Sequence, residues 1–194
     1  MGHSQTDKAA SRERVLRIAA RKVRAEGVTR PGIAELMQEA GLTHGGFYKH
    51  FTSREDLISQ ATDLALAEGS AAMEQAARGP DPRAGLIDGY LSPEHRDSPD
   101  TGCALVTLGA AAGRGDQHFK EAYERQVRHY LDLITRPGED PGPARAEAML
   151  TLSAMVGAML MARAVADPAL SDELLATVAG QLKGDAAGAA ATAA

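Results

Sequence analysis

Apolar positions along the chain recur mostly at helical spacing, and this pattern is the first guide to the fold. Within 11–26, apolar residues from Val15 to Val23 share one face, and Gly27 follows as a stop signal. Similar patterns predict further helices over 33–40, 44–51, 54–77, 83–91, 103–112, 116–135, 144–166 and 171–183. Valine and isoleucine are too sparse for a convincing sheet. The sequence therefore predicts an all-α chain of about nine helices, without an internal repeat.

Breaks in the pattern mark the loops. Segment 79–82 reads GPDP and interrupts the helical pattern. By composition, 92–102 and 136–143 are expected to be loops. The alanine-rich tail 184–194 is of low complexity, and we expect it to be disordered.

Composition limits the class of protein. Of 194 residues, 44% are hydrophobic but only 4% are aromatic and none is tryptophan, which favours a core of small aliphatic side chains. A single cysteine excludes an intramolecular disulfide and a cysteine-rich zinc site, and no metal or cofactor is expected. The polar N-terminus shows no signal peptide, and the longest uncharged apolar run, 148–162, is too short to span a bilayer. We therefore expect a soluble, cytoplasmic protein.

Charge is distributed unevenly along the chain. Residues 1–54 carry ten Lys/Arg and five Asp/Glu, a balance of +5, whereas residues 55–194 carry eleven and twenty-one, a balance of −10. A basic N-terminal segment on an acidic body suggests that this segment meets a polyanion.

The segment 33–51 matches the pattern of a helix-turn-helix. Two short helices joined by a glycine-containing turn follow a longer helix, and the second short helix of such a motif enters the major groove of DNA. Adjacent Gly45 and Gly46 would allow its backbone to come close to the DNA. Phe47 and Phe51, four residues apart, are expected to face inward. The expected donors to bases and phosphates are Thr43, His44, Tyr48, Lys49, His50 and Arg54.

The stretch ELMQEAGLTHGGFYKHFTSREDL, residues 35–57, closely resembles the DNA-binding signature of TetR-family transcriptional regulators. The resemblance extends over about 12–65, and YLSPEHRD…GCALVTLGAAAGR, within 90–114, resembles one branch of that family. It implies an all-helical homodimer with a DNA-binding domain, 1–52, and a ligand-binding and dimerisation domain, 53–183, linked by the helix 54–77. It also implies a repressor that a small-molecule inducer releases from a pseudo-palindromic operator.

Position by position, the resemblance places Thr43, His44 and Gly45 at bases and Tyr48, Lys49 and His50 at phosphates. Family members often carry lysine at the position of His44 and threonine or serine at that of Gly46. These differences concern the operator sequence rather than DNA binding itself.

The remainder of the chain says less about chemistry. Side chains that could line a ligand cavity are Tyr90, Cys103, Tyr123, Met155 and Met159. For the methionines, core packing or a dimer contact is the more ordinary role, and the tyrosines could simply belong to the core. Cys103 could also sense electrophiles, or act as an enzyme nucleophile, but no sequence motif supplies that thiol with a base or an oxyanion hole. We therefore expect no enzyme. A constitutive DNA-binding protein without a ligand is the other alternative, against which the long segment after the motif argues.

Overall fold

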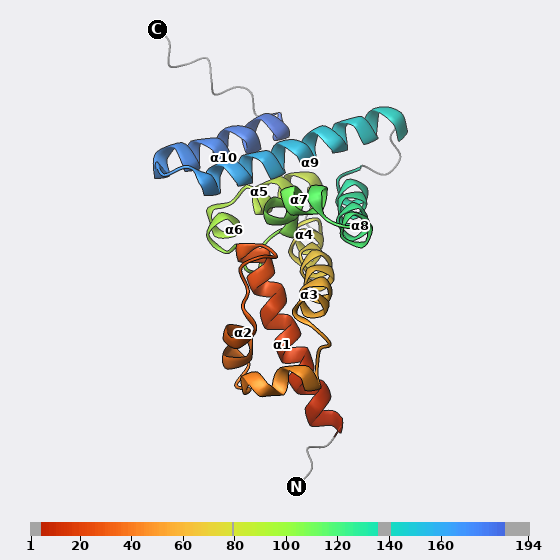
Figure 1. Cartoon of the computed structure of the whole chain (residues 1–194). Helices are drawn as coiled ribbons and strands as arrows, with labels where there is room; N and C mark the ends of the chain where they lie inside the picture. Colours follow the sequence, from red (N-terminus) through yellow and green to blue (C-terminus); the bar gives the residue numbers. More distant parts are fainter. Residues whose placement is uncertain (1–4, 79, 136–140, 185–194) are drawn as a thin grey trace. The chain divides into compact units, whose positions relative to one another are not determined.

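A computed structural model gives the fold and describes residues 5–78, 80–135 and 141–184 (Figure 1). These residues form ten α-helices, one 3-10 helix and no strand, which confirms the predicted all-α class. The helices are α1 (Gln5–Glu26), α2 (Ile33–Glu39), η1 (His44–Lys49), α3 (Arg54–Glu68), α4 (Ser70–Ala76), α5 (Pro82–Tyr90), α6 (Pro93–Asp97), α7 (Ala104–Arg114), α8 (Gln117–Ile134), α9 (Pro141–Ala164) and α10 (Pro168–Lys183).

The chain divides into two compact units. Unit 1 takes its described residues from Met1–Gly69 and Cys103–Glu124, and unit 2 from Ser70–Gly102 and Arg125–Ala194. Helix α7 and the first turns of α8 therefore belong to the same unit as α1, α2, η1 and α3.

Unit 1 is built around α1, which packs along α3 and also contacts α2 and α7. The apolar face predicted for α1 is its buried face, since Val15, Ala19 and Val23 have no exposed surface. The glycine predicted to end this helix does so in the left-handed region, with φ +85° at Gly27. Its amide donates to the Val23 carbonyl at 2.9 Å, and the chain then turns toward α2.

Unit 2 contains α9 and α10, which lie side by side, and α5 and α6, which pack against α10 and α9 (Figure 1). Its core contains Leu86, Ile87, Tyr90, Met155 and Met159, each at most 1% exposed.

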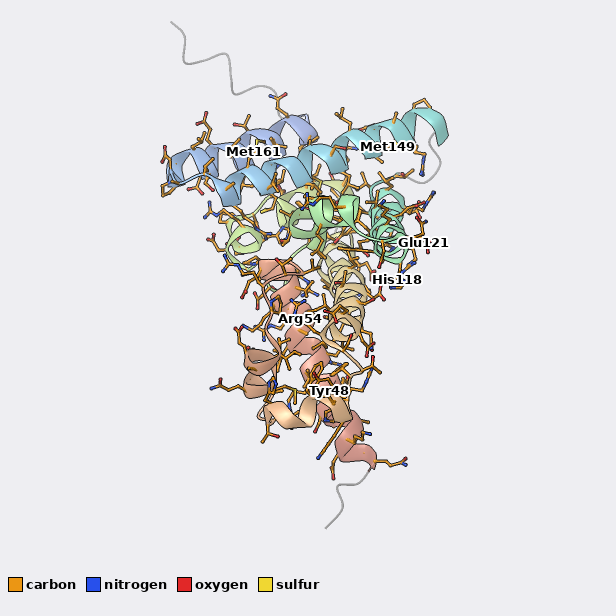
Figure 2. All side chains as sticks on the ribbon, viewed as in Figure 1. Tyr48, Arg54, His118, Glu121, Met149 and Met161 are labelled. Carbon is orange, nitrogen blue, oxygen red and sulfur yellow. The ribbon has the colours of Figure 1, made fainter. Side chains whose placement is uncertain are left out.

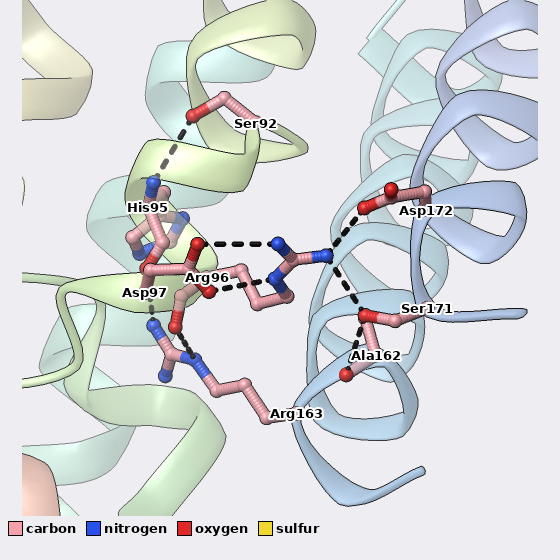
Figure 3. A network of polar contacts seen from close by, with 8 residues as sticks. All are labelled: Ser92, His95, Arg96, Asp97, Ala162, Arg163, Ser171 and Asp172. Atoms are coloured by element: carbon pink, nitrogen blue, oxygen red, sulfur yellow. Dashed lines mark hydrogen bonds and ion pairs between the residues drawn. The ribbon is translucent and has the colours of Figure 1, made fainter. Parts of the chain in front are cut away.

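The predicted loop 92–102 contains a short helix, α6, so that prediction was wrong over 93–97. Ser92 caps α6 by accepting a hydrogen bond from the His95 amide at 3.1 Å, and Pro93 stands at its first turn. Figure 3 shows how this turn is held: Arg96 donates to the Ser171 hydroxyl at 3.0 Å, and Arg163 donates to the His95 carbonyl at 2.6 Å. Composition could not reveal these contacts, because they join residues about 70 positions apart.

Other boundaries differ more modestly. The first helix begins at Gln5 rather than at Ser11, and the single helix predicted over 54–77 is two helices, α3 and α4, separated at Gly69. Helix α9 begins at Pro141, inside the predicted loop 136–143, of which 136–140 lie outside the described residues. The predicted disordered tail likewise lies outside them from 185 onward.

One segment, Gly142–Ala164, is long and apolar enough to cross a membrane by length and composition alone, which the shorter uncharged run in the sequence did not suggest. Core helices of soluble proteins pass the same test, and α9 packs against α10 through a buried face that includes Met155 and Met159.

Candidate nucleic-acid interface

The two short helices of the predicted motif, α2 and η1, pack against each other in unit 1. Gly41 turns the chain after α2 in the left-handed region, with φ +69°. The Leu42 amide then donates to the Met37 carbonyl at 2.8 Å, which closes the turn. η1 begins two residues later, after Thr43 in extended conformation. This arrangement is the helix-turn-helix that the sequence predicted, with its second helix in 3-10 form.

Two phenylalanines anchor η1 to the body of unit 1. Phe47 has no exposed surface and Phe51 is 2% exposed, as their spacing predicted. Their rings stack with centroids 5.7 Å apart. Burial of these two rings fixes which side of η1 faces the core and which faces solvent.

The opposite side of η1 is a polar, exposed surface. Thr43, His44, Gly45 and Lys49 are exposed, and Tyr48 is 71% exposed (Figure 2). The hydroxyl of Thr43 makes no capping hydrogen bond, although this residue occupies the N-cap of η1. We call these five residues the reader face. Hydroxyl, imidazole, phenol and ammonium groups on it are all hydrogen-bond donors, the groups that bases and phosphates require.

Neither glycine of the pair is required by the fold. A Cβ atom added to Gly45 would meet no atom within 4 Å in the part of the chain that the structure describes. One added to Gly46 would lie 3.6 Å from the Thr43 hydroxyl and 3.7 Å from the Met37 methyl, which are ordinary contacts. The backbone of both residues is also free of positive φ. Packing within unit 1 therefore does not explain why the chain carries glycine at these two positions.

His50 is half-buried rather than fully outward-facing, and its Nδ1 atom is buried without a hydrogen-bond partner among the described residues. Burial lowers the pKa of this imidazole, and the nearby cations Lys8, Arg12 and Lys49 lower it further. His50 is therefore neutral at pH 7. The same three cations surround it with positive charge, and Lys8, which is exposed, was not among the predicted site residues.

Arg54, predicted as a donor to DNA, makes three hydrogen bonds within unit 1. Its guanidinium donates to the carbonyl oxygens of Val28, Thr29 and Pro31, at 3.1, 3.0 and 3.2 Å. These carbonyls belong to the turn between α1 and α2, so Arg54 holds that turn against the start of α3. Ser53 caps the same helix by accepting from the Asp56 amide at 3.1 Å.

The candidate ligand residues fall into both units. Cys103 and Tyr123 lie in unit 1, where Cys103 is 2% exposed and the Tyr123 hydroxyl donates to the Leu105 carbonyl at 3.2 Å. Tyr90, Met155 and Met159 lie in unit 2, each at most 1% exposed. The structure thus gives four of the five a buried, core-like environment.

Comparison with known proteins agrees with the fold and the motif. A sequence model described as "Bacterial regulatory proteins, tetR family" matches residues 16–61. An uncharacterized HTH-type transcriptional regulator of Mycobacterium tuberculosis is 27% identical over 168 residues, which cover 78% of this chain and 84% of that protein.

Two solved structures show the same fold over nearly the whole chain. A TetR transcriptional regulator from Chloroflexus aurantiacus superposes with a TM-score of 0.76 at 21% identity, covering 92% of this chain and 97% of that one. A TetR-family regulator from Streptomyces coelicolor gives 0.67 at 25% identity, covering 91% and 96%.

Proposed function

Because the chain belongs to the TetR family of transcriptional regulators, whose DNA-binding helix-turn-helix it carries, we propose that it represses transcription from a pseudo-palindromic operator and that a small molecule releases it. The observation that carries the proposal is the reader face on η1. Its five residues are exposed, while Phe47 and Phe51 fix the orientation of the helix from the other side.

Electrostatics supports contact between this surface and DNA. Lys8 and Lys49 are exposed and lie near His50, so their charges add to those of the donors on the reader face. The segment 1–54 is basic whereas the rest of the chain is acidic, which favours approach of DNA through this segment alone. Thr43, His44 and Gly45 then face the bases, and Tyr48, Lys49 and His50 face the phosphates. Arg54 contributes indirectly under this proposal, because it holds the turn that precedes α2.

Self-association is supported by apolar side chains on α9 and α10. Leu150 is 68% exposed, Leu160 51%, and Met149 and Met161 46% each, while Leu170 on α10 is 42% exposed. Figure 2 labels Met149 and Met161 on α9. A second copy of the chain would cover such a surface by two-fold symmetry and would present two reader faces to the two halves of an operator. The protein acts as a homodimer in the cytoplasm under this proposal.

The alternatives have less support. A thiol enzyme would need an accessible Cys103, and this side chain is 2% exposed. A constitutive DNA-binding protein would leave unit 2 without a sensing role, and an adaptable site among Tyr90, Met155 and Met159 is the sensing role we propose for it.

The test combines mass measurement in solution with selection of DNA sequences by the purified protein. We expect a dimer at micromolar concentration and enrichment of a two-fold symmetric sequence. Leu160→Glu should give a monomer that retains no DNA, whereas Glu94→Arg, an exposed change on α6, should do neither. A wild-type protein that stays monomeric and enriches no sequence would refute the proposal.

A further inference from the structure

A cavity of about 300 Å³ lies within unit 1, behind the helix-turn-helix. Its walls come from three places: the turn after α1, one face of α3, and the turn from α7 into the start of α8. Two of the lining residues, Arg54 and His118, are labelled in Figure 2. The volume is at the lower end of the range for small-molecule sites.

One side of the cavity is apolar. Val28, Ile58 and Phe119 provide it, and Ile58 is 7% exposed. The ring of Phe119 is packed against Gly115, where an added Cβ atom would lie 2.9 Å from the ring. This close packing against the Gly115 backbone restricts the Phe119 ring, whose face forms part of the cavity lining.

A threonine hydroxyl also lines the cavity. Thr62 is 4% exposed and belongs to its wall, and no hydrogen bond joins the Thr62 side chain to another described residue. The hydroxyl can both donate and accept, so it offers a hydrogen-bond partner to a polar group that enters the cavity.

The charge of the lining is negative. Glu55, Asp63 and Asp116 contribute carboxylates. The Glu55 amide and the Ser53 hydroxyl donate hydrogen bonds that lower the pKa of the Glu55 carboxyl group, which is therefore ionised at neutral pH. The one guanidinium in the lining, Arg54, already donates to three carbonyl oxygens.

The two aspartates are held in fixed positions. An oxygen of Asp63 lies 3.0 Å from His118 Nε2, and an oxygen of Asp116 accepts from the Phe119 amide at 2.9 Å. The second oxygen and further lone pairs of the Asp116 carboxylate can accept more hydrogen bonds, and the Asp63 carboxylate adds a negative charge held in place by its contacts.

We propose that this cavity binds a compact organic cation, an ammonium group on an apolar body, with the ammonium between the carboxylates and the Thr62 hydroxyl and the body against Val28, Ile58 and Phe119. An anion would meet three carboxylates, and a neutral apolar molecule would leave the polar wall without a partner. An aromatic body also suits the flat face of Phe119.

Occupancy of the cavity has a direct route to DNA binding. Arg54 lines the cavity and holds the carbonyls of Val28, Thr29 and Pro31, and the last of these lies two residues before α2. A cation placed beside Arg54 repels its guanidinium and weakens its hold on that turn. This consequence rests on the proposed function, whereas binding of the cation itself does not.

The first experiment titrates the full-length protein, without DNA, with 2-phenylethylammonium by calorimetry. 2-Phenylethanol and phenylacetate have similar apolar bodies with neutral and negative polar groups. We expect the ammonium to bind at least about tenfold more tightly than the alcohol, and phenylacetate not to bind, because hydrogen bonds to charged groups are the stronger ones. Equal binding of all three, or no binding of the ammonium at millimolar concentration, would overturn the proposal.

Matched variants locate the site. Asp116→Asn removes one charge but keeps an N-cap side chain of equal quality, and Thr62→Val removes the hydroxyl but keeps the branched shape. Each should weaken ammonium binding by roughly fivefold or more, whereas Asp132→Asn, an exposed change in unit 2, should leave it unchanged. Unaltered affinity in both cavity variants, with their melting temperatures intact, would place the ammonium elsewhere and refute the assignment.

DNA binding is measured separately on the same proteins. Loss of operator binding on addition of the ammonium in the wild-type protein, but not in Asp116→Asn, is the expected result. If the ammonium binds the cavity and the operator complex persists, the link through Arg54 is refuted while both the cation site and the DNA-binding proposal stand.

Discussion

Gly45 allows a sharp test of how η1 meets DNA. The residue is exposed on the reader face, and a Cβ atom built on it would touch nothing within 4 Å. Its backbone has no positive φ, so a larger residue is not strained there. Gly45→Leu therefore changes the surface that would approach the bases without changing the packing of Phe47 or Phe51.

The two expected effects have opposite signs. In the folded protein, replacing an exposed glycine by a residue of better helical propensity stabilises by about 0.5 kcal/mol and at most about 1 kcal/mol. On DNA, the leucine side chain occupies the space into which the backbone must approach, and each reader face loses at least one base contact, worth about 1–3 kcal/mol. A dimer loses this twice, about 2–6 kcal/mol in all, so affinity should fall by at least about thirtyfold.

Operator retardation and thermal unfolding, measured on the same preparation, separate the two effects. The matched control is Gly113→Leu on α7, which is also exposed and whose added Cβ would also meet nothing within 4 Å. We expect the control to bind the operator normally and Gly45→Leu to bind none at the same concentration. Normal binding by Gly45→Leu, or a melting temperature several degrees below that of the wild type, would show that the glycine does not serve close approach.

Four further predictions follow from named side chains. Lys49→Ala should weaken binding to all DNA sequences about equally and reduce the salt slope by about 1, as expected if Lys49 contacts a phosphate as we propose; an unchanged slope would contradict that position. Thr43→Ala should instead alter the preference between operator variants, which a selection experiment on both proteins detects. Burial lowers the pKa of His95 below its ordinary value, so the stability it contributes is present above about pH 6.5 and declines as pH falls through the folded-state pKa; urea midpoints at pH 7.5 and 5.5 should differ less in His95→Gln than in the wild type. Cys103, 2% exposed, should react with a small maleimide only on unfolding, and rapid labelling of the native protein would restore the sensor hypothesis.

Local signals predicted the helix-turn-helix well because its boundaries depend on the backbone and on neighbouring residues. Gly27 and Gly41 end their helices in the left-handed region, and Ser53 caps the next one, all within a few residues of the elements they delimit. The inward direction of Phe47 and Phe51 was also readable, since two large apolar side chains one turn apart lie on the same face.

The misread segments depend on distant contacts. Helix α6 has the composition of a loop, and its Arg96 and the Arg163 that holds it find partners more than 60 residues away. The break at Gly69 was missed for a different reason. Its φ of −60° is right-handed, so the glycine gives no left-handed stop, and no proline follows it in the next three residues.

Arg54 shows why the site itself was only partly readable. A basic residue at the start of a helix, directly after a DNA-reading segment, has the sequence context of a phosphate contact. Its three acceptors, however, are backbone carbonyls 23 to 26 residues earlier, and backbone carbonyls leave no trace in sequence. Lysine would offer one ammonium to these acceptors, whereas the planar fork of arginine can reach all three at once. The identity of this side chain therefore follows from the turn that positions α2 and, through it, η1. Arg54 also lies in the wall of the cavity. Among the residues that line the cavity, it is the nearest in sequence to the reader face, and its guanidinium is the group that a bound cation would repel.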